Sequence, residues 1–187
     1  MPNKAAALAT LGEKLEGLNW MIDSGMAVEI YTGGKRVAND IDVVILEKDM
    51  DEAARRLGTN VTTRSADKNG LQIINEKYAS TTIEDMTIEL VCGSGEYMIN
   101  GKERCMNVTK EHLACARKIS YLGVELNVAA REEILVHKTI LGREKDKKDV
   151  ELLLENFTPD EKLLDLFLDM YRFDESEKKD MLAKILK

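Results

Sequence analysis

Two aspartates stand one residue apart at the start of an apolar run, in the segment Asp40-Ile41-Asp42 followed by Val43 to Leu46. The run predicts a buried strand, and side chains alternate between the two faces of a strand. Asp40 and Asp42 therefore point to the same side, where two neighbouring carboxylates repel each other. A hard divalent cation such as Mg²⁺ removes that repulsion and usually keeps room for substrate phosphates. The pair is typical of half of a metal site for phosphoryl or nucleotidyl transfer, although two solvated aspartates at a strand end would give the same triplet.

A third carboxylate lies on another predicted strand, over 86–92. Ile88 and Leu90 fall on one face of this segment, and Glu89 falls on the other. A charge in the middle of a strand is costly to bury without a partner. Glu89 is therefore the candidate for the third acidic ligand of a two-metal site, unless its face is solvated or the strand lies at the edge of the sheet.

Basic residues gather at the end of a helix predicted over 132–141. Lys138 falls within the apolar stripe, where a lysine either extends to the surface or meets an anion in a cleft. Arg143 and Lys148 follow soon after. Cations gathered at one place in an acidic chain indicate a binding site for a triphosphate, although a solvated helix end would show the same pattern. His137 is predicted to be a surface or packing histidine rather than a ligand.

The composition limits the kinds of partner. The chain has 187 residues and a net charge of −7 at pH 7, which argues against coating long nucleic acid, because that affinity comes mainly from cations. A small nucleotide or a single RNA end in a local basic cleft is still compatible with this charge. No Cys-x-x-Cys pair occurs among the three cysteines, Cys92, Cys105 and Cys115, so we expect reduced thiols rather than a zinc site. The chain has no apolar run of membrane-span length and no recognisable signal peptide, which predicts a cytoplasmic protein.

The order of these patterns predicts an α+β fold. Residues 1–128 are expected to form a mixed sheet flanked by helices, and residues 129–187 a helical appendage that completes the cleft. Helices are expected over 5–18, 26–31, 51–57, 132–141, 147–154 and 176–186, and strands over 20–22, 40–46, 61–63, 71–74 and 86–92. One more helix is expected to start with Thr158 as its cap and Pro159 as its first residue.

Several motifs occur in a characteristic order between residues 18 and 155. Ser24-Gly25 opens a helix after an apolar strand, and Arg36 stands four residues before the Asp40-Ile41-Asp42 strand. The carboxylate Glu89 follows on a neighbouring strand, and Lys138, Arg143 and Lys148-Asp149 come later. This order resembles the polymerase-β-like nucleotidyltransferase superfamily. It is most similar to the small prokaryotic members, including the toxin-type branch of abortive-infection systems.

The resemblance implies an enzyme that moves a nucleoside monophosphate from an NTP to an acceptor hydroxyl, with Mg²⁺ or Mn²⁺. The implied catalytic metal ligands are Asp40, Asp42 and Glu89, and the implied nucleotide contacts are Ser24, Gly25, Arg36, Lys138, Arg143 and Lys148. The acceptor could be a tRNA 3′ end, a protein side chain or a small molecule.

The alternative is an inactive member that senses nucleotide or binds a protein, for example as a toxin–antitoxin component. Two departures from the family pattern favour it: Ser24 replaces the first glycine of the pair, and Ala38 stands where a polar residue is common. The three retained carboxylates favour the enzyme.

Overall fold

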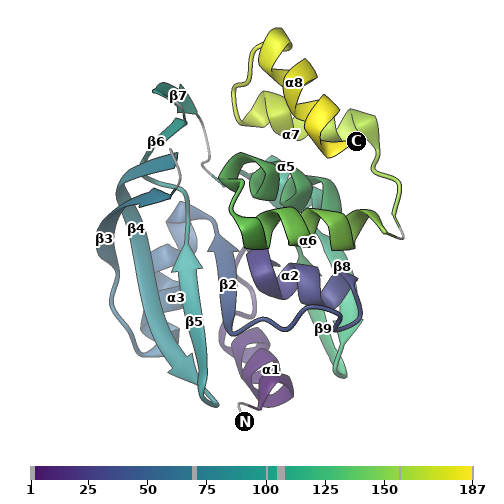
Figure 1. Ribbon diagram of the computed structural model, residues 1–187. Coiled ribbons are helices and arrows are strands. Elements are labelled where there is room, and N and C mark those ends of the chain that lie inside the picture. The colour runs from purple at the N-terminus through teal and green to yellow at the C-terminus, as the bar shows by residue number, and fades with distance from the viewer. Residues whose placement is uncertain (1–2, 69–70, 100, 105–107, 156, 187) are drawn as a thin grey trace.

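The computed structural model describes residues 3–68, 71–99, 101–104, 108–155 and 157–186. One mixed sheet runs through it in the order β7-β6-β4-β5-β2-β1-β9-β8, with β3 paired to β4 (Figure 1). Its strands are β1 Trp20–Asp23, β2 Asp40–Ile45, β3 Thr62–Lys68, β4 Leu71–Ile83, β5 Met86–Val91, β6 Glu96–Ile99, β7 Lys102–Arg104, β8 Arg117–Tyr121 and β9 Val124–Val128. The predicted α+β class with a mixed sheet is confirmed.

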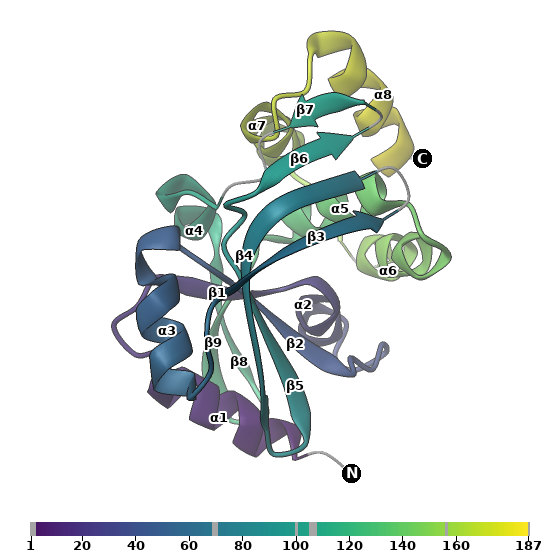
Figure 2. The same ribbon diagram turned by 90° about the vertical axis from the view of Figure 1, so that its left-hand side faces the viewer.

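Helices cover both sides of the central strands. They are α1 Lys4–Lys14, α2 Ser24–Tyr31, α3 Met50–Leu57, α4 Lys110–Cys115, α5 Arg131–Leu141, α6 Glu144–Leu154, α7 Glu161–Met170 and α8 Glu175–Ile185, with a 3₁₀ turn at Glu47–Asp49. Figure 2 shows α1 and α3 on one side of the central strands, and α2, α5 and α6 on the other. Helix α2 packs on β1 and β2 and contacts both α5 and α6, so this helix lies between the sheet and these two helices.

The apolar core explains why β2 is central. Ile41, Val43 and Ile45 alternate along β2 and are fully buried. The same core includes Leu8 of α1 and Phe167 of α7. Burying one such side chain stabilises the fold by roughly 1.5–3 kcal/mol. The sheet and the C-terminal helices therefore share one core, and this shared packing fixes α5 over the sheet.

Some local predictions are wrong. Helix α7 begins at Glu161, not at Pro159, because the side chain of Asp160 accepts the backbone N–H of Lys162 and caps the helix in place of Thr158. Strand β4 is much longer than the predicted strand over 71–74, and β6 to β9 and α4 were not predicted. The missed segments are short: β8 has no buried residue, and β9 alternates apolar and polar residues over only five positions. Alternation over so few residues is a weak signal for a strand.

Two further predictions concern thiols and membrane spans. Cys92 and Cys115 are free thiols, as expected, and Cys105 lies outside the described residues. Within the described part of the chain, no helix combines the length and apolar character needed to cross a bilayer.

Candidate active site

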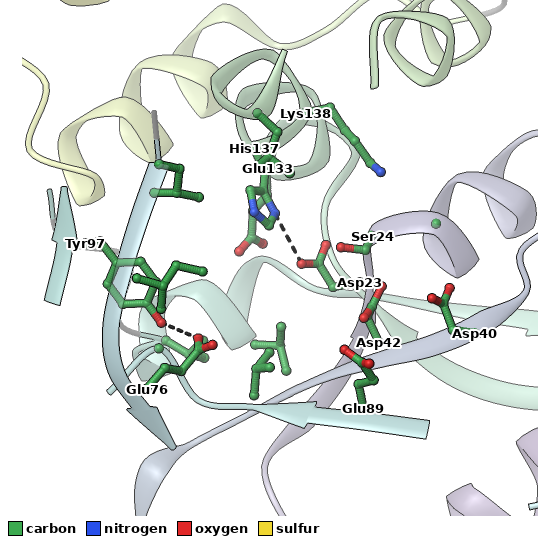
Figure 3. Close-up of a pocket in the computed structure, with 18 of the residues that line it drawn as sticks. Asp23, Ser24, Asp40, Asp42, Glu76, Glu89, Tyr97, Glu133, His137 and Lys138 are labelled. Carbon is green, nitrogen blue, oxygen red and sulfur yellow. Dashed lines mark hydrogen bonds and ion pairs between the residues drawn. The ribbon is translucent and has the colours of Figure 1, made fainter. Parts of the chain in front are cut away.

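A cavity of about 200 Å³ lies between the sheet and α5 (Figure 3). Its polar lining consists of Asp23, Ser24, Gly25, Arg36, Asp40, Asp42, Arg64, Glu76, Glu89, His112, Glu133, His137, Lys138, Arg143 and Lys145. All the site residues predicted from the sequence are in this lining except Lys148. Lys148 is exposed on α6, because its neighbour Asp149 faces inward and successive helix residues are about 100° apart. Lys145, on the same helix, lines the cavity instead.

Strand register brings three carboxylates into one row across β1, β2 and β5. Asp23 pairs with Asp42 between the antiparallel β1 and β2, and Asp42 pairs with Glu89 between the parallel β2 and β5. Side chains at paired positions have Cβ atoms roughly 4.5–5.5 Å apart. Asp40 lies two residues from Asp42 and faces the same way (Figure 3). The row Asp23–Asp42–Glu89, with Asp40 beside it, is called here the carboxylate row.

The carboxylate row places unusual electrostatic stress on Asp42. Burial, and after it the nearby charges of Asp40, Asp23 and Glu89, together raise the pKa of Asp42 from 3.8 to about 6. Burial also acts to raise the pKa of Asp23, but a hydrogen bond and the charge of His137 outweigh it, so the Asp23 pKa is lowered. His137 Nδ1 lies 3.5 Å from Asp23 Oδ2 (Figure 3). His137 is therefore a site residue, which the sequence prediction missed.

The donor chemistry of the row fits a divalent cation, because carboxylate oxygens are the ligands that Mg²⁺ and Mn²⁺ prefer. In the conformation that the described residues adopt, no three acidic, histidine or cysteine side chains meet closely enough to hold an ion. Glu89 is held elsewhere: Tyr78 Oη donates to it at 3.0 Å, and Arg64 Nη1 lies 3.5 Å from it. Asp40 and Asp42 fit as ligands where they stand, whereas Glu89 must first leave Tyr78 and Arg64. Its role as third ligand stays a prediction.

The cations opposite the row are not free. Lys138 Nζ is 2.9 Å from Asp149 Oδ2 and 3.2 Å from Asp146 Oδ1, and its side chain is only 3% exposed. Arg143 Nε lies 2.5 Å from Asp146 Oδ2, and Arg36 Nε lies 2.7 Å from Asp149 Oδ1. Lys138 thus meets two carboxylates of α6 rather than an empty cleft. We call these five side chains, Arg36, Lys138, Arg143, Asp146 and Asp149, the basic cluster; its formal charge is one positive unit.

The start of α2 joins the carboxylate row to the basic cluster. A Cβ atom at Gly25 would lie 2.7 Å from Arg36 Nη1, and that nitrogen donates to the Gly25 carbonyl at 3.3 Å. Glycine is thus what lets the Arg36 guanidinium lie against the start of the helix. Ser24 has φ +53°, a left-handed conformation that costs a residue with a side chain about 1 kcal/mol. Its position at the start of α2 places strain within the site.

We expect Ser24→Gly to change the free energy of unfolding by less than about 0.5 kcal/mol, because relief of the left-handed strain offsets the greater entropy of glycine in the unfolded chain. The same change is expected to weaken NTP binding, because it removes a hydroxyl that faces the cavity. Ser24→Ala is the matched variant, since it loses the hydroxyl but keeps the strain. Urea denaturation and nucleotide titration measure both effects. Wild-type affinity in both variants would show that the Ser24 hydroxyl serves no ligand.

Two solved structures, described as a nucleotidyltransferase and a nucleotidyltransferase-like protein, share this fold. A protein from Thermotoga maritima assigned as a nucleotidyltransferase superposes with a TM-score of 0.57 at 17% identity, covering 80% of this chain and 91% of that one. An antigenic nucleotidyltransferase-like protein from Paracoccidioides brasiliensis superposes with a TM-score of 0.52 at 13% identity, covering 100% of this chain and 89% of that one. At these identities the likeness concerns the fold. The chain therefore has the fold of the polymerase-β-like nucleotidyltransferases, as predicted, whereas the toxin-type branch stays a prediction.

A scan against protein-family models and a search of curated proteins both gave no match.

Proposed function

We propose that the protein is a nucleotidyltransferase that moves a nucleoside monophosphate from an NTP to the hydroxyl group of an acceptor. The observation that carries the proposal is the carboxylate row facing the basic cluster across one cavity, in a chain with the nucleotidyltransferase fold. Four carboxylates gathered at one end of buried strands are costly unless a cation joins them. The basic cluster offers the complementary charge for a triphosphate.

The nucleotide side of the cavity is assigned to the start of α2 and to the basic cluster. Backbone N–H groups at a helix start favour bound phosphate, and Ser24 and Gly25 stand there. Arg36, Lys138 and Arg143 would contact the triphosphate, held in place by Asp146 and Asp149. Because their positions are fixed before the nucleotide arrives, they need not reorganise when charge develops on the leaving pyrophosphate. The helices of 129–187 would thereby complete the cleft whose sheet side lies in 1–128.

Asp40 and Asp42 would hold Mg²⁺ or Mn²⁺, with Glu89 joining them once released from Tyr78 and Arg64. When bound, such an ion neutralises phosphate charge and lowers the pKa of a bound hydroxyl. In the reaction the acceptor oxygen forms a bond to the α-phosphorus. The bond from that phosphorus to the bridging oxygen breaks, and pyrophosphate leaves with the electron pair. A carboxylate of the row accepts the hydroxyl proton and passes it to solvent. Such chemistry uses the Mg²⁺ and NTP of the cytoplasm, where we expect the protein to act.

A thermal melt tests whether the site exists. We expect millimolar Mg²⁺ or Mn²⁺ together with an NTP to raise the melting temperature, because ligands that bind only the folded state stabilise it by about 2.7 kcal/mol at a hundred times Kd. Asp40→Asn should remove most of this rise, while Asp51→Asn, an exposed acid on α3, should keep it. If metal and nucleotide leave the melting temperature of the parent protein unchanged, the proposed binding site is contradicted. A rise without any transfer to an acceptor would instead support a nucleotide sensor.

A further inference from the structure

The cavity extends past the carboxylate row into a second compartment between α4, α5 and the strands β4 and β6. Figure 3 shows the Glu133 carboxylate directed into this space beside Asp23, with Tyr97 and Glu76 across from it. Leu71, Ile73 and Leu141 supply apolar lining. We call this space the far compartment. None of its residues has a part in holding the triphosphate.

One wall of the far compartment carries buried polar atoms without partners. Glu133 Oε2, Asp23 Oδ1 and His112 Nε2 are buried and have no hydrogen-bond partner among the described residues. Glu133 also has no ion pair within that part of the chain, and its side chain lies deep in the protein. A buried polar group without a partner destabilises the fold. Three such atoms on one wall therefore point to a ligand that would satisfy them.

The hydrogen-bonding roles of these atoms are set by their surroundings. The Nδ1 atom of His112 accepts the backbone N–H of Thr109 at 3.3 Å. Burial lowers the pKa of His112, so the ring is neutral and its proton is on Nε2. The wall thus offers one N–H donor beside two carboxyl groups. A hydroxyl group, which both donates and accepts, fits this combination.

The far compartment is a poor site for anions. Burial raises the pKa of Glu133 well above its ordinary value and favours its neutral form, so the negative charge here comes from Asp23 on one wall and Glu76 on the other. The cations nearby are already engaged, since Arg64 Nε lies 2.8 Å from Glu76 Oε2 and His137 lies against Asp23. Tyr97 donates to the other oxygen of Glu76. An acceptor carrying phosphate or carboxylate would lie beside these carboxylates with the nearby cations already engaged, whereas an uncharged or amine-bearing acceptor needs no such cation.

We propose that the far compartment is the acceptor subsite, and that it binds a small hydroxyl compound without negative charge, a polyol or an amino alcohol, through Glu133 and His112. The proposal rests on the proposed nucleotidyl transfer, because it names the acceptor class for that reaction. The apolar lining would contact the carbon skeleton of the acceptor, and the hydroxyl groups would satisfy the unpartnered atoms. Asp23 lies where the far compartment meets the rest of the cavity, since it belongs to both the carboxylate row and this wall.

The test uses the full chain with Mg²⁺ and NTPs labelled at the α-phosphate. A cell extract is divided beforehand into protein, RNA, and a small-molecule pool that an ion exchanger splits into anionic and non-anionic compounds. We expect label in the non-anionic small molecules. Label in RNA, in protein or only in the anionic pool would overturn the acceptor class while supporting nucleotidyl transfer. No label in any fraction would overturn the proposed function itself, and the acceptor subsite with it.

The Glu133→Leu variant is the second test of the acceptor subsite. We expect it to lower kcat/KM for the labelled acceptor about tenfold or more, because a site that pairs a hydroxyl loses that contact. The rise in melting temperature with Mg²⁺ and NTP should not change. The metal-free variant should be as stable as the parent or more stable, since an unpartnered buried carboxyl is removed. Glu144→Leu, an exposed change of the same kind at the start of α6, should alter none of these. A destabilised Glu133→Leu variant with unchanged kcat/KM would show that Glu133 is structural and overturn the assignment.

Discussion

Asp42→Asn is expected to reduce nucleotidyl transfer by at least a hundredfold and, at the same time, to stabilise the metal-free protein. The loss follows from removing a central member of the carboxylate row, and single electrostatic groups at a reaction centre are worth about 10²–10³ in rate. The gain follows from linkage. The pKa of Asp42 is about 6 in the folded protein against an ordinary 3.8, so the folded state binds this proton more tightly than the unfolded state.

The sign of the pH dependence follows from that difference. Stability falls as the pH rises from about 4 through 6, and above pH 6 the ionised Asp42 costs the fold on the order of 2–3 kcal/mol. Asparagine avoids this cost, so its advantage should be present at pH 7 and vanish near pH 4. Urea denaturation with a chelator at both pH values measures it, with Asp51→Asn as the control. A variant less stable than the parent at pH 7 would show that Asp42 has a structural partner.

Lys138→Ala is expected to destabilise the protein by about 1–3 kcal/mol, because Asp146 and Asp149 lose a buried donor while Arg143 and Arg36 still offset their charges. Asp146 is fully buried and the Asp149 side chain is only 4% exposed, and both lie within 3.2 Å of Lys138 Nζ. For a chain of this size the loss corresponds to a fall in melting temperature of roughly 2–12 °C.

Lys147→Ala is the matched control, because Lys147 is exposed and pairs with the exposed Glu144. Surface pairs of this kind contribute about 0–1 kcal/mol. Thermal melts of the two variants at one pH give the contrast. Equal melting temperatures would mean that the carboxylates of α6 do not depend on Lys138, and the basic cluster would lose its structural basis.

The alternation of side chains between the two faces of a strand made part of the site predictable. Asp40 and Asp42 share a face of the sheet because they are two residues apart on β2. Glu89 and Ile88 are adjacent on β5, so their side chains lie on opposite faces. These are local properties, and local spacing determines them.

The missed features depend on contacts between distant segments. Asp23 looked like a residue before a turn, and only its pairing with Asp42 places it in the carboxylate row. Asp149 is separated from Arg36 by 113 residues, so their ion pair was not visible in the sequence. Glu133 looked like an ordinary acidic residue in the first turn of α5. Its burial against the cavity follows from how α5 packs on the sheet, which no helical periodicity specifies.

The most direct test of the proposed reaction compares one NTP labelled at the α-phosphate with the same NTP labelled at the γ-phosphate, each incubated with the protein, Mg²⁺ and the non-anionic small-molecule pool. Nucleotidyl transfer predicts that the α-label becomes attached to the acceptor, whereas the γ-label is released as pyrophosphate. The Asp42→Asn variant should show neither. A γ-label found on the acceptor would mean phosphoryl transfer, and retention of both labels in unreacted NTP, with this pool and with the whole extract, would contradict nucleotidyl transfer.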